Sequence, residues 1–325
     1  MAKRIEFAET GGPEVLRIRE FEPPALGPHE VRVTNWAIGL NFIDIYVRTG
    51  LYPVRDLPSG LGTEAAGVIE AVGEEVKAFR EGDRVVYATG PLGAYATHHT
   101  LPADKVVMLP DSIGFDQAAA AMLKGLTVQY LLRQVYPIKS GDTFLFHAAA
   151  GGVGLIACQW AKSLGARLIG TVSTPEKAEF ARKNGAWATI NYREENVVER
   201  VRELTDGRMC PVVYDSVGRD TWETSLDCLA PRGLMVSFGN ASGPVEGVNL
   251  ATLNQKGSLF VTRPGLAGYA DTRERLEAMS KELFGVMSDG SVHINIGCRF
   301  RLDEAGEAQD NLASRRTSGS TILIP

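Results

Sequence analysis

The sequence has few of the side chains that form metal sites and disulfide frameworks. Among 325 residues it holds four cysteines and five histidines, with no CxxC pair and no HExxH motif. Only His98 and His99 are adjacent, and adjacent residues of a strand point to opposite faces, so they form a poor chelating pair. These absences argue against zinc-knuckle and other metal-binding proteins and against thioredoxin-like redox proteins. The cysteines are predicted to be free thiols.

Long apolar runs and clusters of positive charge are also missing. No uninterrupted apolar segment reaches the length of a membrane span, and the N-terminus MAKRIEFAETGG lacks the apolar core of a secretory signal. The formal net charge is −5, which argues against nucleic acid or an anionic membrane as the main partner. With 44% hydrophobic residues, the sequence predicts a cytoplasmic globular protein large enough for two domains.

The pattern of the sequence changes near residue 115. Before it, short alternating runs at 30–35, 66–72 and 83–87 are separated by Gly and Pro, which predicts a β-rich region. A helix is predicted at 116–136. After it, strands alternate with helices, which indicates an α/β region with a parallel sheet covered on both faces. Its predicted strands are 143–147, 167–172, 188–192, 212–216, 233–238 and 258–262, and its predicted helices are 154–163, 175–184, 194–204 and 221–229. The tail, with a helix at 272–287, a strand at 292–300, a helix at 302–313 and a strand at 321–324, is predicted to return to the first region.

The turn after the strand at 143–147 is typical of a dinucleotide-binding site. In the G-x-G-x-x-G fingerprint the second glycine lets a pyrophosphate approach the backbone, and the third lets helix and strand pack closely. Gly151 and Gly154 occupy these two places, whereas Ala149 occupies the first. Because the turn follows a strand and opens a helix, its N–H groups are predicted to hold a pyrophosphate. The predicted contacts are Ala150, Gly151, Gly152 and Val153; a tight turn that binds nothing is the alternative.

The residues beyond this turn indicate which nucleotide is bound. An NAD site carries a carboxylate for the ribose 2′-hydroxyl about 20 residues further on. Here the second strand ends in Ser173 and Thr174, Lys177 follows one helical turn later, and Tyr192 ends the third strand. Small hydroxyls and a cation suit a 2′-phosphate, so the sequence predicts NADPH. A solvated helix-surface lysine is the alternative for Lys177.

The segment 141–162, GDTFLFHAAAGGVGLIACQWAK, resembles the characteristic segment of the zinc-free, ζ-crystallin-like quinone oxidoreductases of the medium-chain dehydrogenase/reductase superfamily. GLGTEAAGV at 60–68, GDRV at 82–85 and RRTSGS at 315–320 resemble further segments of that superfamily, with Ser320 in place of the usual lysine. The resemblance covers essentially the whole chain. It implies a GroES-like β-barrel catalytic domain over 1–124 and 264–325, and a doubly wound Rossmann domain that binds NADPH over 125–263. Cofactor and substrate would share the cleft between them.

The resemblance also bears on the metal. Zinc alcohol dehydrogenases of this superfamily carry Cys, His and Cys at three catalytic positions, which local motif matching equates with Asn41, Thr63 and Lys124. An amide, a hydroxyl and an ammonium do not form a zinc site, and the four-cysteine structural lobe is absent. We therefore expect a reaction that needs no Lewis acid, as with a quinone or an α,β-unsaturated carbonyl acceptor.

The site residues are assigned from the same resemblance. Asn41, Tyr46 and Tyr52 would line the active-site cleft and donate hydrogen bonds to the substrate, although the tyrosines could equally be packing aromatics. Asp44 is given a capping role rather than an acid role. The remaining expected cofactor contacts are Asn41, Lys124, Thr127, Phe238, Gly239, Arg263 and Arg315, the last with a surface ion pair as its alternative.

The leading hypothesis is an NADPH:quinone reductase, a homodimer or tetramer joined through the sheet edge at 258–262. The runner-up is an NADPH-dependent alkene (enone) reductase. A nucleotide-binding structural or RNA-binding ζ-crystallin-like protein is the alternative of another class, which the acidic charge does not favour.

Overall fold

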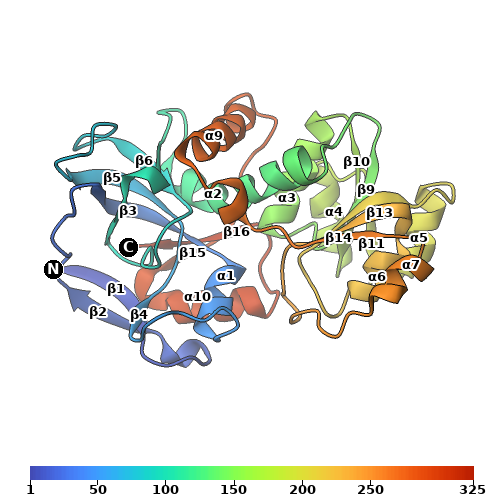
Figure 1. Ribbon diagram of the computed structural model, residues 1–325, viewed down its shortest axis with the longest axis horizontal. Coiled ribbons are helices and arrows are strands. Elements are labelled where there is room, and N and C mark those ends of the chain that lie inside the picture. The colour runs from blue at the N-terminus through green and yellow to red at the C-terminus, as the bar shows by residue number, and fades with distance from the viewer. The chain divides into compact units, whose positions relative to one another are not determined.

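The computed structural model describes residues Met1–Pro325, which divide into two compact units. The first unit comprises Met1–Leu126, Tyr269–Asp289 and Ile294–Pro325, and the second comprises Thr127–Gly268 and Gly290–His293. The first is therefore built from both ends of the chain, which Figure 1 shows as blue-to-teal and orange-to-red ribbons. No helix is long and apolar enough to cross a lipid bilayer.

The first unit is built around a GroES-like arrangement of mostly antiparallel strands. Its larger sheet has the order β15-β16-β3-β5-β6-β8, with β7 also paired to β3. These strands are β3 (Glu30–Leu40), β5 (Ala65–Val72), β6 (Arg84–Tyr87), β7 (His98–Pro102), β8 (Val106–Met108), β15 (Ile296–Arg301) and β16 (Ser320–Ile324). A smaller sheet has the order β2-β1-β4, made of β1 (Ala2–Phe7), β2 (Arg17–Phe21) and β4 (Ser59–Gly60). The two neighbours His98 and His99 alternate as predicted, since only His99 is buried.

Four helices accompany these sheets. They are α1 (Phe42–Arg48), α2 (Phe115–Tyr130), α9 (Arg273–Ser288) and α10 (Ala305–Ala313). The core between the sheets is apolar and aromatic, with Phe7, Tyr87 and Tyr95 almost completely buried. Tyr87 still satisfies its hydroxyl, which donates to the Asn35 side chain at 2.9 Å. Buried tyrosines of this kind contribute apolar area while keeping a hydrogen-bond partner.

The second unit is a Rossmann domain with one parallel sheet. The strand order is β11-β10-β9-β12-β13-β14, so the first strand in sequence lies near the centre and the chain winds outward in both directions. The strands are β9 (Thr143–Phe146), β10 (Arg167–Val172), β11 (Ala188–Asn191), β12 (Cys210–Asp215), β13 (Leu229–Ser237) and β14 (Phe260–Thr262). The helices are α3 (Gly152–Ser163), α4 (Pro175–Lys183), α5 (Val197–Leu204), α6 (Trp222–Asp227), α7 (Leu250–Gln255) and α8 (Leu266–Tyr269). Strands covered by helices on both faces bury nearly every residue, as in β12.

The predicted elements of the α/β region are confirmed, with shifted ends that have local causes. The helix predicted from 194 begins only at Val197, because the Asn196 side chain accepts from two first-turn amides and caps it there. The strand predicted from 292 begins at Ile296, because His293 instead exchanges hydrogen bonds with the Gln159 side chain at 2.8 and 2.9 Å. Helices α1, α7 and α8 were not predicted.

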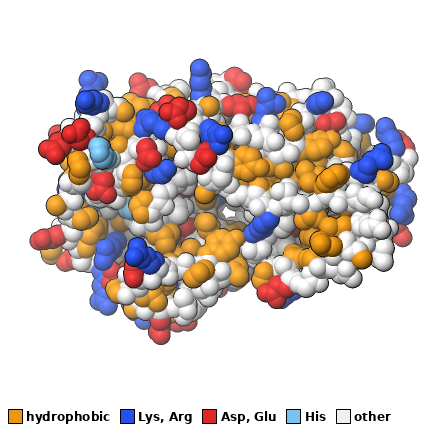
Figure 2. All heavy atoms as spheres, in the orientation of Figure 1, with side chains coloured by type: hydrophobic (Ala, Val, Ile, Leu, Met, Phe, Trp, Pro, Cys, Tyr) orange, Lys and Arg blue, Asp and Glu red, His pale blue; other side chains and the backbone are white.

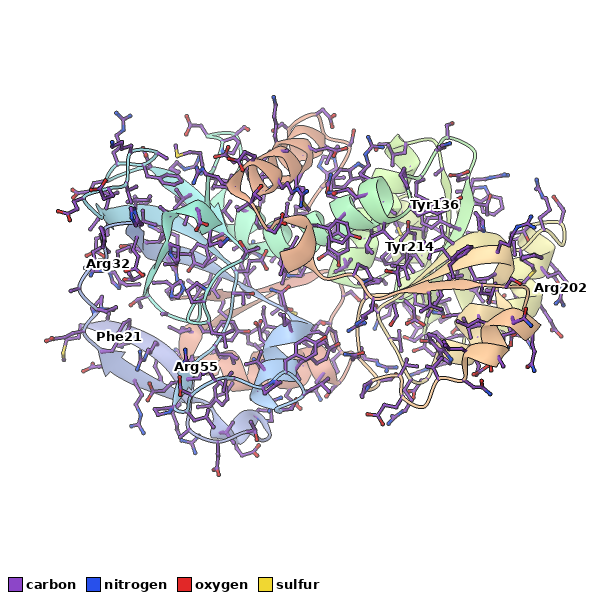
Figure 3. The ribbon with its side chains drawn as sticks, in the orientation of Figure 1. Phe21, Arg32, Arg55, Tyr136, Arg202 and Tyr214 are labelled. Atoms are coloured by element: carbon purple, nitrogen blue, oxygen red, sulfur yellow. The ribbon has the colours of Figure 1, made fainter.

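The helix predicted to reach residue 136 changes its form near its end. After α2, residues Leu131–Val135 form a π-helical turn. Tyr214, on the neighbouring strand β12, donates its hydroxyl to the Leu131 carbonyl oxygen at 2.9 Å and so satisfies a carbonyl at the irregular turn. Figure 3 labels Tyr214 together with Tyr136, whose carbonyl is its second acceptor at 3.4 Å.

Candidate functional site

The glycine turn joins β9 to α3 in a conformation that requires glycine at position 154. Ala148 adopts a left-handed conformation with φ 56°, and Gly151 is the N-cap of α3. A Cβ added to Gly154 would lie 2.5 Å from the Ala148 carbonyl oxygen and 2.6 Å from Ala149 Cα. Only glycine fits at this position, so Gly154 lets the start of α3 pack directly on the turn.

Ala149 stands where the fingerprint has its first glycine, and the next strand makes room for it. Ala149 is completely buried, and a Cβ added to Gly170 of β10 would lie 2.4 Å from Ala149 Cβ. The methyl group that Ala149 adds therefore occupies the space that Gly170 leaves empty. The sequence analysis missed this pairing, although a glycine inside the strand Arg167–Val172 was a visible signal of a close approach.

The turn fits a bound pyrophosphate. A Cβ added to Gly151 would approach only one atom, the Ala148 oxygen at 3.3 Å, so packing within the chain does not require glycine there. A ligand that approaches the backbone does require it. The first-turn amides of α3 have no partner inside the helix, and its N-terminus is the positive end of the helix dipole. No acidic side chain lies in that first turn.

The residues predicted to hold a 2′-phosphate gather where β10 ends and α4 begins. Thr174 is the N-cap of α4, and its hydroxyl oxygen accepts from the Lys177 amide at 3.3 Å. Ser173, Thr174 and Lys177 are half-buried, whereas Tyr192, just after β11, is exposed. Glu176, exposed in the first turn of α4, is a carboxylate that the prediction did not weigh. A hydrogen bond from Thr174 lowers the pKa of Glu176.

A second group gathers at the ends of β13 and β14. Arg263 donates to the Gly239 carbonyl oxygen at 3.0 Å and to the Ser237 hydroxyl at 3.3 Å. In the side-chain orientation that satisfies both amide atoms, the Asn240 nitrogen donates to the Gly239 carbonyl oxygen at 2.8 Å and its oxygen accepts from Arg263 at 3.0 Å. A Cβ on Gly239 would lie 2.3 Å from the Ser216 carbonyl oxygen, so this position also requires glycine. Phe238 lies beside them, with its ring 5.6 Å from that of Phe146.

In the first unit, Asn41 and Lys124 meet at a buried carboxyl, Glu64, that the sequence analysis did not single out. The Asn41 side chain donates to Glu64 Oε2 at 2.7 Å, and Lys124 Nζ lies 3.6 Å from the same oxygen. Burial raises the pKa of Glu64, and the nearby Lys124 charge opposes this rise. A Cβ on Gly39 would lie 2.0 Å from Glu64 Oε2, so Gly39 leaves the room that the carboxyl occupies.

Asp44 fixes the backbone of Asn41, as its expected capping role requires. Asn41 and Asp44 form a capping box at the start of α1, in which the Asn41 amide donates to Asp44 Oδ2 at 2.8 Å. The Tyr95 hydroxyl donates to the same oxygen at 2.9 Å. Burial raises the pKa of Asp44 to about 7, while its hydrogen bonds from Asn41 and Tyr95 oppose this rise.

The two candidate tyrosines pack against one another. The rings of Tyr46 and Tyr52 meet edge to face with their centroids 5.3 Å apart, and the Tyr52 amide donates to the Tyr46 carbonyl oxygen at 3.0 Å. Thr127 lies on α2 within the second unit, and Arg315 lies exposed in the turn between α10 and β16. Within each unit the structure thus brings most candidates into small groups.

The three positions compared with zinc ligands have other partners or none. Asn41 and Lys124 share Glu64, and Thr63 Oγ1 is buried without a hydrogen-bond partner. No group of three or more His, Cys, Asp or Glu side chains is arranged to hold a metal ion. The side chains at these positions do not suit zinc, because an amide and an ammonium are not zinc ligands in proteins.

Comparison with known proteins places the chain in a family. Residues 27–111 match the alcohol dehydrogenase GroES-like domain, and residues 152–281 match the zinc-binding dehydrogenase family. The chain is 67% identical to a quinone oxidoreductase of Pseudomonas aeruginosa over 100% of both chains. It is 45% identical to a 2-haloacrylate reductase of Burkholderia, over 97% of this chain and 96% of that protein.

A solved structure gives the same result. The crystal structure of Escherichia coli quinone oxidoreductase complexed with NADPH superposes with a TM-score of 0.98 at 60% identity, over 99% of this chain and 100% of that one. The chain belongs to the zinc-independent quinone oxidoreductases of the medium-chain dehydrogenase/reductase superfamily.

Proposed function

We propose that this protein is an oxidoreductase that reduces quinones with NADPH and without a metal ion. The observation that carries the proposal is the glycine turn, which fits a pyrophosphate in a chain 67% identical to a quinone oxidoreductase over its full length. NADPH, when bound, supplies a hydride from its nicotinamide ring. Residues 1–124 and 264–325 are assigned to the catalytic domain and 125–263 to the cofactor domain.

The residues proposed to hold the cofactor act in three ways. At the N-terminus of α3 the amides of Ala150, Gly152 and Val153 bind the pyrophosphate, while Gly151, whose amide donates to the Ala148 carbonyl oxygen, lets the phosphate approach its backbone. Hydroxyls and a cation at the end of β10 bind the 2′-phosphate, which distinguishes NADPH from NADH. The remaining side chains and glycines orient the nicotinamide and its ribose. The proposed contacts of the last two groups are Ser173, Thr174, Lys177 and Tyr192, and Asn41, Lys124, Thr127, Phe238, Gly239, Arg263 and Arg315.

Asn41, Tyr46 and Tyr52 are proposed to orient the acceptor and to donate hydrogen bonds to its oxygen. An amide nitrogen carries two hydrogens, and Asn41 gives one of them to Glu64, so one remains for the acceptor. Glu64 also faces Lys124, so one carboxyl holds two of the side chains at the positions compared with zinc ligands. An acceptor that stabilises its own developing charge suits such a site, because no Lewis acid is needed.

Steady-state rates with NADPH and a benzoquinone-type acceptor test the proposal. We expect turnover that EDTA does not change, and a dissociation constant for NADPH smaller than that for NADH. Activity lost on chelation and restored by zinc would contradict the metal-free mechanism. Equal or tighter binding of NADH would contradict the assignment of Ser173, Thr174 and Lys177.

An NADPH-dependent alkene (enone) reductase is the second candidate. The 45% identity to a 2-haloacrylate reductase favours it, since that protein's name indicates an activated alkene as its substrate. Comparing kcat/KM for a benzoquinone and for an enone under identical conditions separates the two. A higher value for the enone would replace the quinone as the substrate class.

The protein is further proposed to be a cytoplasmic homodimer, joined through β14. This strand is the edge of the parallel sheet, and its Phe260 and Val261 side chains are exposed. Leu250 on the preceding helix is exposed as well. Figure 2 shows hydrophobic side chains over the region where Figure 1 places β13 and β14. An apolar edge strand of this kind is suited to pairing with a second copy.

A further inference from the structure

Three neighbouring strands of the second unit end in buried polar side chains that the proposed function does not use. β9 pairs with β10 on one side and β12 on the other, and His147, Thr171 and Asp215 stand at their carboxyl ends. All three are almost completely buried. Parallel sheets bind their ligands at this edge, so a polar cluster here is well placed to influence a bound nucleotide.

These side chains form one continuous chain of hydrogen bonds. His147 Nδ1 lies 3.0 Å from Thr171 Oγ1, and His147 Nε2 lies 3.0 Å from Ser225 Oγ. Ser225 donates to Asp215 Oδ2 at 2.6 Å. At the other end, the Ala148 amide donates to Thr171 Oγ1 at 3.3 Å. The hydrogen bonds thus run from the glycine turn after β9, through Thr171 of β10, to the Asp215 carboxyl of β12.

Asp215, at one end of this series of hydrogen bonds, fixes the direction in which the Ser225 hydroxyl donates. Asp215 receives a donor at each accepting position of its two oxygens. The donors are the Val217 and Gly218 amides at 2.7 and 3.0 Å on Oδ1, and the Thr221 and Ser225 hydroxyls at 2.7 and 2.6 Å on Oδ2. Because a hydroxyl carries a single proton, Ser225 gives it to Asp215 and accepts from its other neighbour.

The remaining bonds then have only one possible direction. Burial lowers the pKa of His147, which keeps the ring neutral with a single hydrogen. Since Ser225 accepts, that hydrogen is on Nε2 and Nδ1 is the acceptor. Thr171 therefore donates its proton to Nδ1 and accepts from the Ala148 amide. Reversing the histidine tautomer would direct a second donor at Thr171 Oγ1 and turn its hydroxyl proton away from His147.

Ala148 is the residue through which this chain can act on the cofactor. Its left-handed φ of 56° is unfavourable for a residue with a Cβ and persists only where surrounding contacts hold it. Its carbonyl oxygen accepts from the Gly151 amide at 3.0 Å. A change in the Ala148 peptide would therefore shift the amides that face the pyrophosphate.

We propose that His147, Thr171, Ser225 and Asp215 are positioning residues, which hold the glycine turn through a one-directional hydrogen-bond chain in the shape that binds the dinucleotide pyrophosphate. The proposal rests on the proposed NADPH site. None of the four needs to touch the nucleotide. Their effect is carried by the Ala148 amide at the end of the chain.

Two variants test the hydrogen-bond chain at different distances from the glycine turn. Thr171→Val removes the acceptor of the Ala148 amide with little change of shape, and Ser225→Ala frees the histidine tautomer without contacting the turn. We expect Thr171→Val to raise the NADPH dissociation constant about tenfold and Ser225→Ala to raise it in the same direction. The double variant should show less than the product of the two effects. Thr171→Ser should restore binding.

Two further measurements separate positioning from simple stability. Thr205→Val removes another buried hydroxyl of the second unit, which donates to the Val201 carbonyl at 2.7 Å and accepts from the Met209 amide at 3.0 Å. This control should lower Tm and leave NADPH binding unchanged. Nitrogen-15 NMR of the imidazole should show the Nε2–H tautomer of His147 in the native protein and a loss of that preference in Ser225→Ala.

The outcomes distinguish this inference from the proposed function. If the native protein binds NADPH and both Thr171→Val and Ser225→Ala bind it equally well, the positioning role is wrong. If the native protein does not bind NADPH at all, the proposed cofactor is wrong. Should Thr171→Val fail to fold, the titration of Ser225→Ala and its NMR spectrum decide the question.

Discussion

Asp44 shows how a single buried carboxyl makes stability depend on pH. Its pKa is raised from the ordinary value of 3.8 to about 7, chiefly by burial. The folded protein therefore holds a proton that the unfolded chain has already lost between these two values. The contribution is fully present below pH 3.8 and is lost as pH rises through 7.

We expect Asp44→Asn to remove this dependence while keeping an oxygen for the Asn41 amide and the Tyr95 hydroxyl. Between pH 5 and pH 8 the native protein should lose roughly 2.5 kcal/mol of unfolding free energy relative to the variant. Urea unfolding of both proteins at the two pH values measures this difference. A constant difference across the range would show that Asp44 keeps the same charge throughout.

Buried His99 makes the free energy of unfolding depend on pH in the opposite direction. Burial lowers the pKa of His99 to about 4, so its contribution is present above pH 6.5 and is lost as pH falls towards 4. The two contributions change over overlapping pH ranges, Asp44 between 3.8 and about 7 and His99 between about 4 and 6.5, and they change in opposite directions. The difference between the native protein and Asp44→Asn at each pH isolates the Asp44 contribution, because His99 is present in both proteins.

Ala149 and Gly170 form a pair in which each residue explains the other. We expect Gly170→Ala alone to cost about 1–3 kcal/mol of unfolding free energy, because its Cβ would overlap Ala149 Cβ. Adding Ala149→Gly should recover most of that loss, since it restores the space. Denaturant unfolding of the two single variants and the double variant measures the coupling. Additive effects would show that the two methyl positions do not compete.

At the scale of single elements, the π-helical turn after α2 depends on one side chain of another strand. Tyr214→Phe removes the hydroxyl that donates to the Leu131 carbonyl. The carbonyl keeps the Tyr136 amide as a more distant donor at 3.3 Å, so losing the hydroxyl should cost about 0.5–1.5 kcal/mol. Thermal unfolding monitored by circular dichroism measures the change, with Tyr192→Phe, an exposed tyrosine of the same unit, as the control. Equal Tm values for the native protein and Tyr214→Phe would contradict this role.

The elements differ in how far the sequence could define them. β10 was predicted at its observed bounds, because an apolar run between a helix-ending glycine and a helix-capping threonine is a local signal. Helix α1 was missed because it is short and its capping box, Asn41 with Asp44, lies inside a segment analysed only for polar site residues. The late start of β15 depends on Gln159, which is distant in sequence from His293.

At the scale of the whole molecule, the proposed dimer is tested by its size in solution. Placing a lysine at Val261 should prevent two copies of β14 from pairing, because it buries a charge at the interface. We expect the native protein to elute as a dimer and Val261→Lys as a monomer in size-exclusion chromatography with light scattering. Ile18→Lys, an exposed position on edge strand β2, is the matched control and should leave the mass unchanged. A dimeric Val261→Lys would contradict the proposed interface.

The sequence alone determined the two-part organisation, the dinucleotide turn and, in the second unit, the order of the six strands and of helices α3 to α6. These features depend on contiguous stretches of the sequence, because the periodicity of apolar residues and the spacing of Gly151 and Gly154 are local patterns. The tertiary structure decided which distant residues meet. Glu64 between Asn41 and Lys124, Gly170 beneath Ala149, and the chain from Ala148 to Asp215 all depend on strand register and packing. A sequence pattern does not encode these pairings locally, because the close approach of two side chains is fixed only when the sheet has formed.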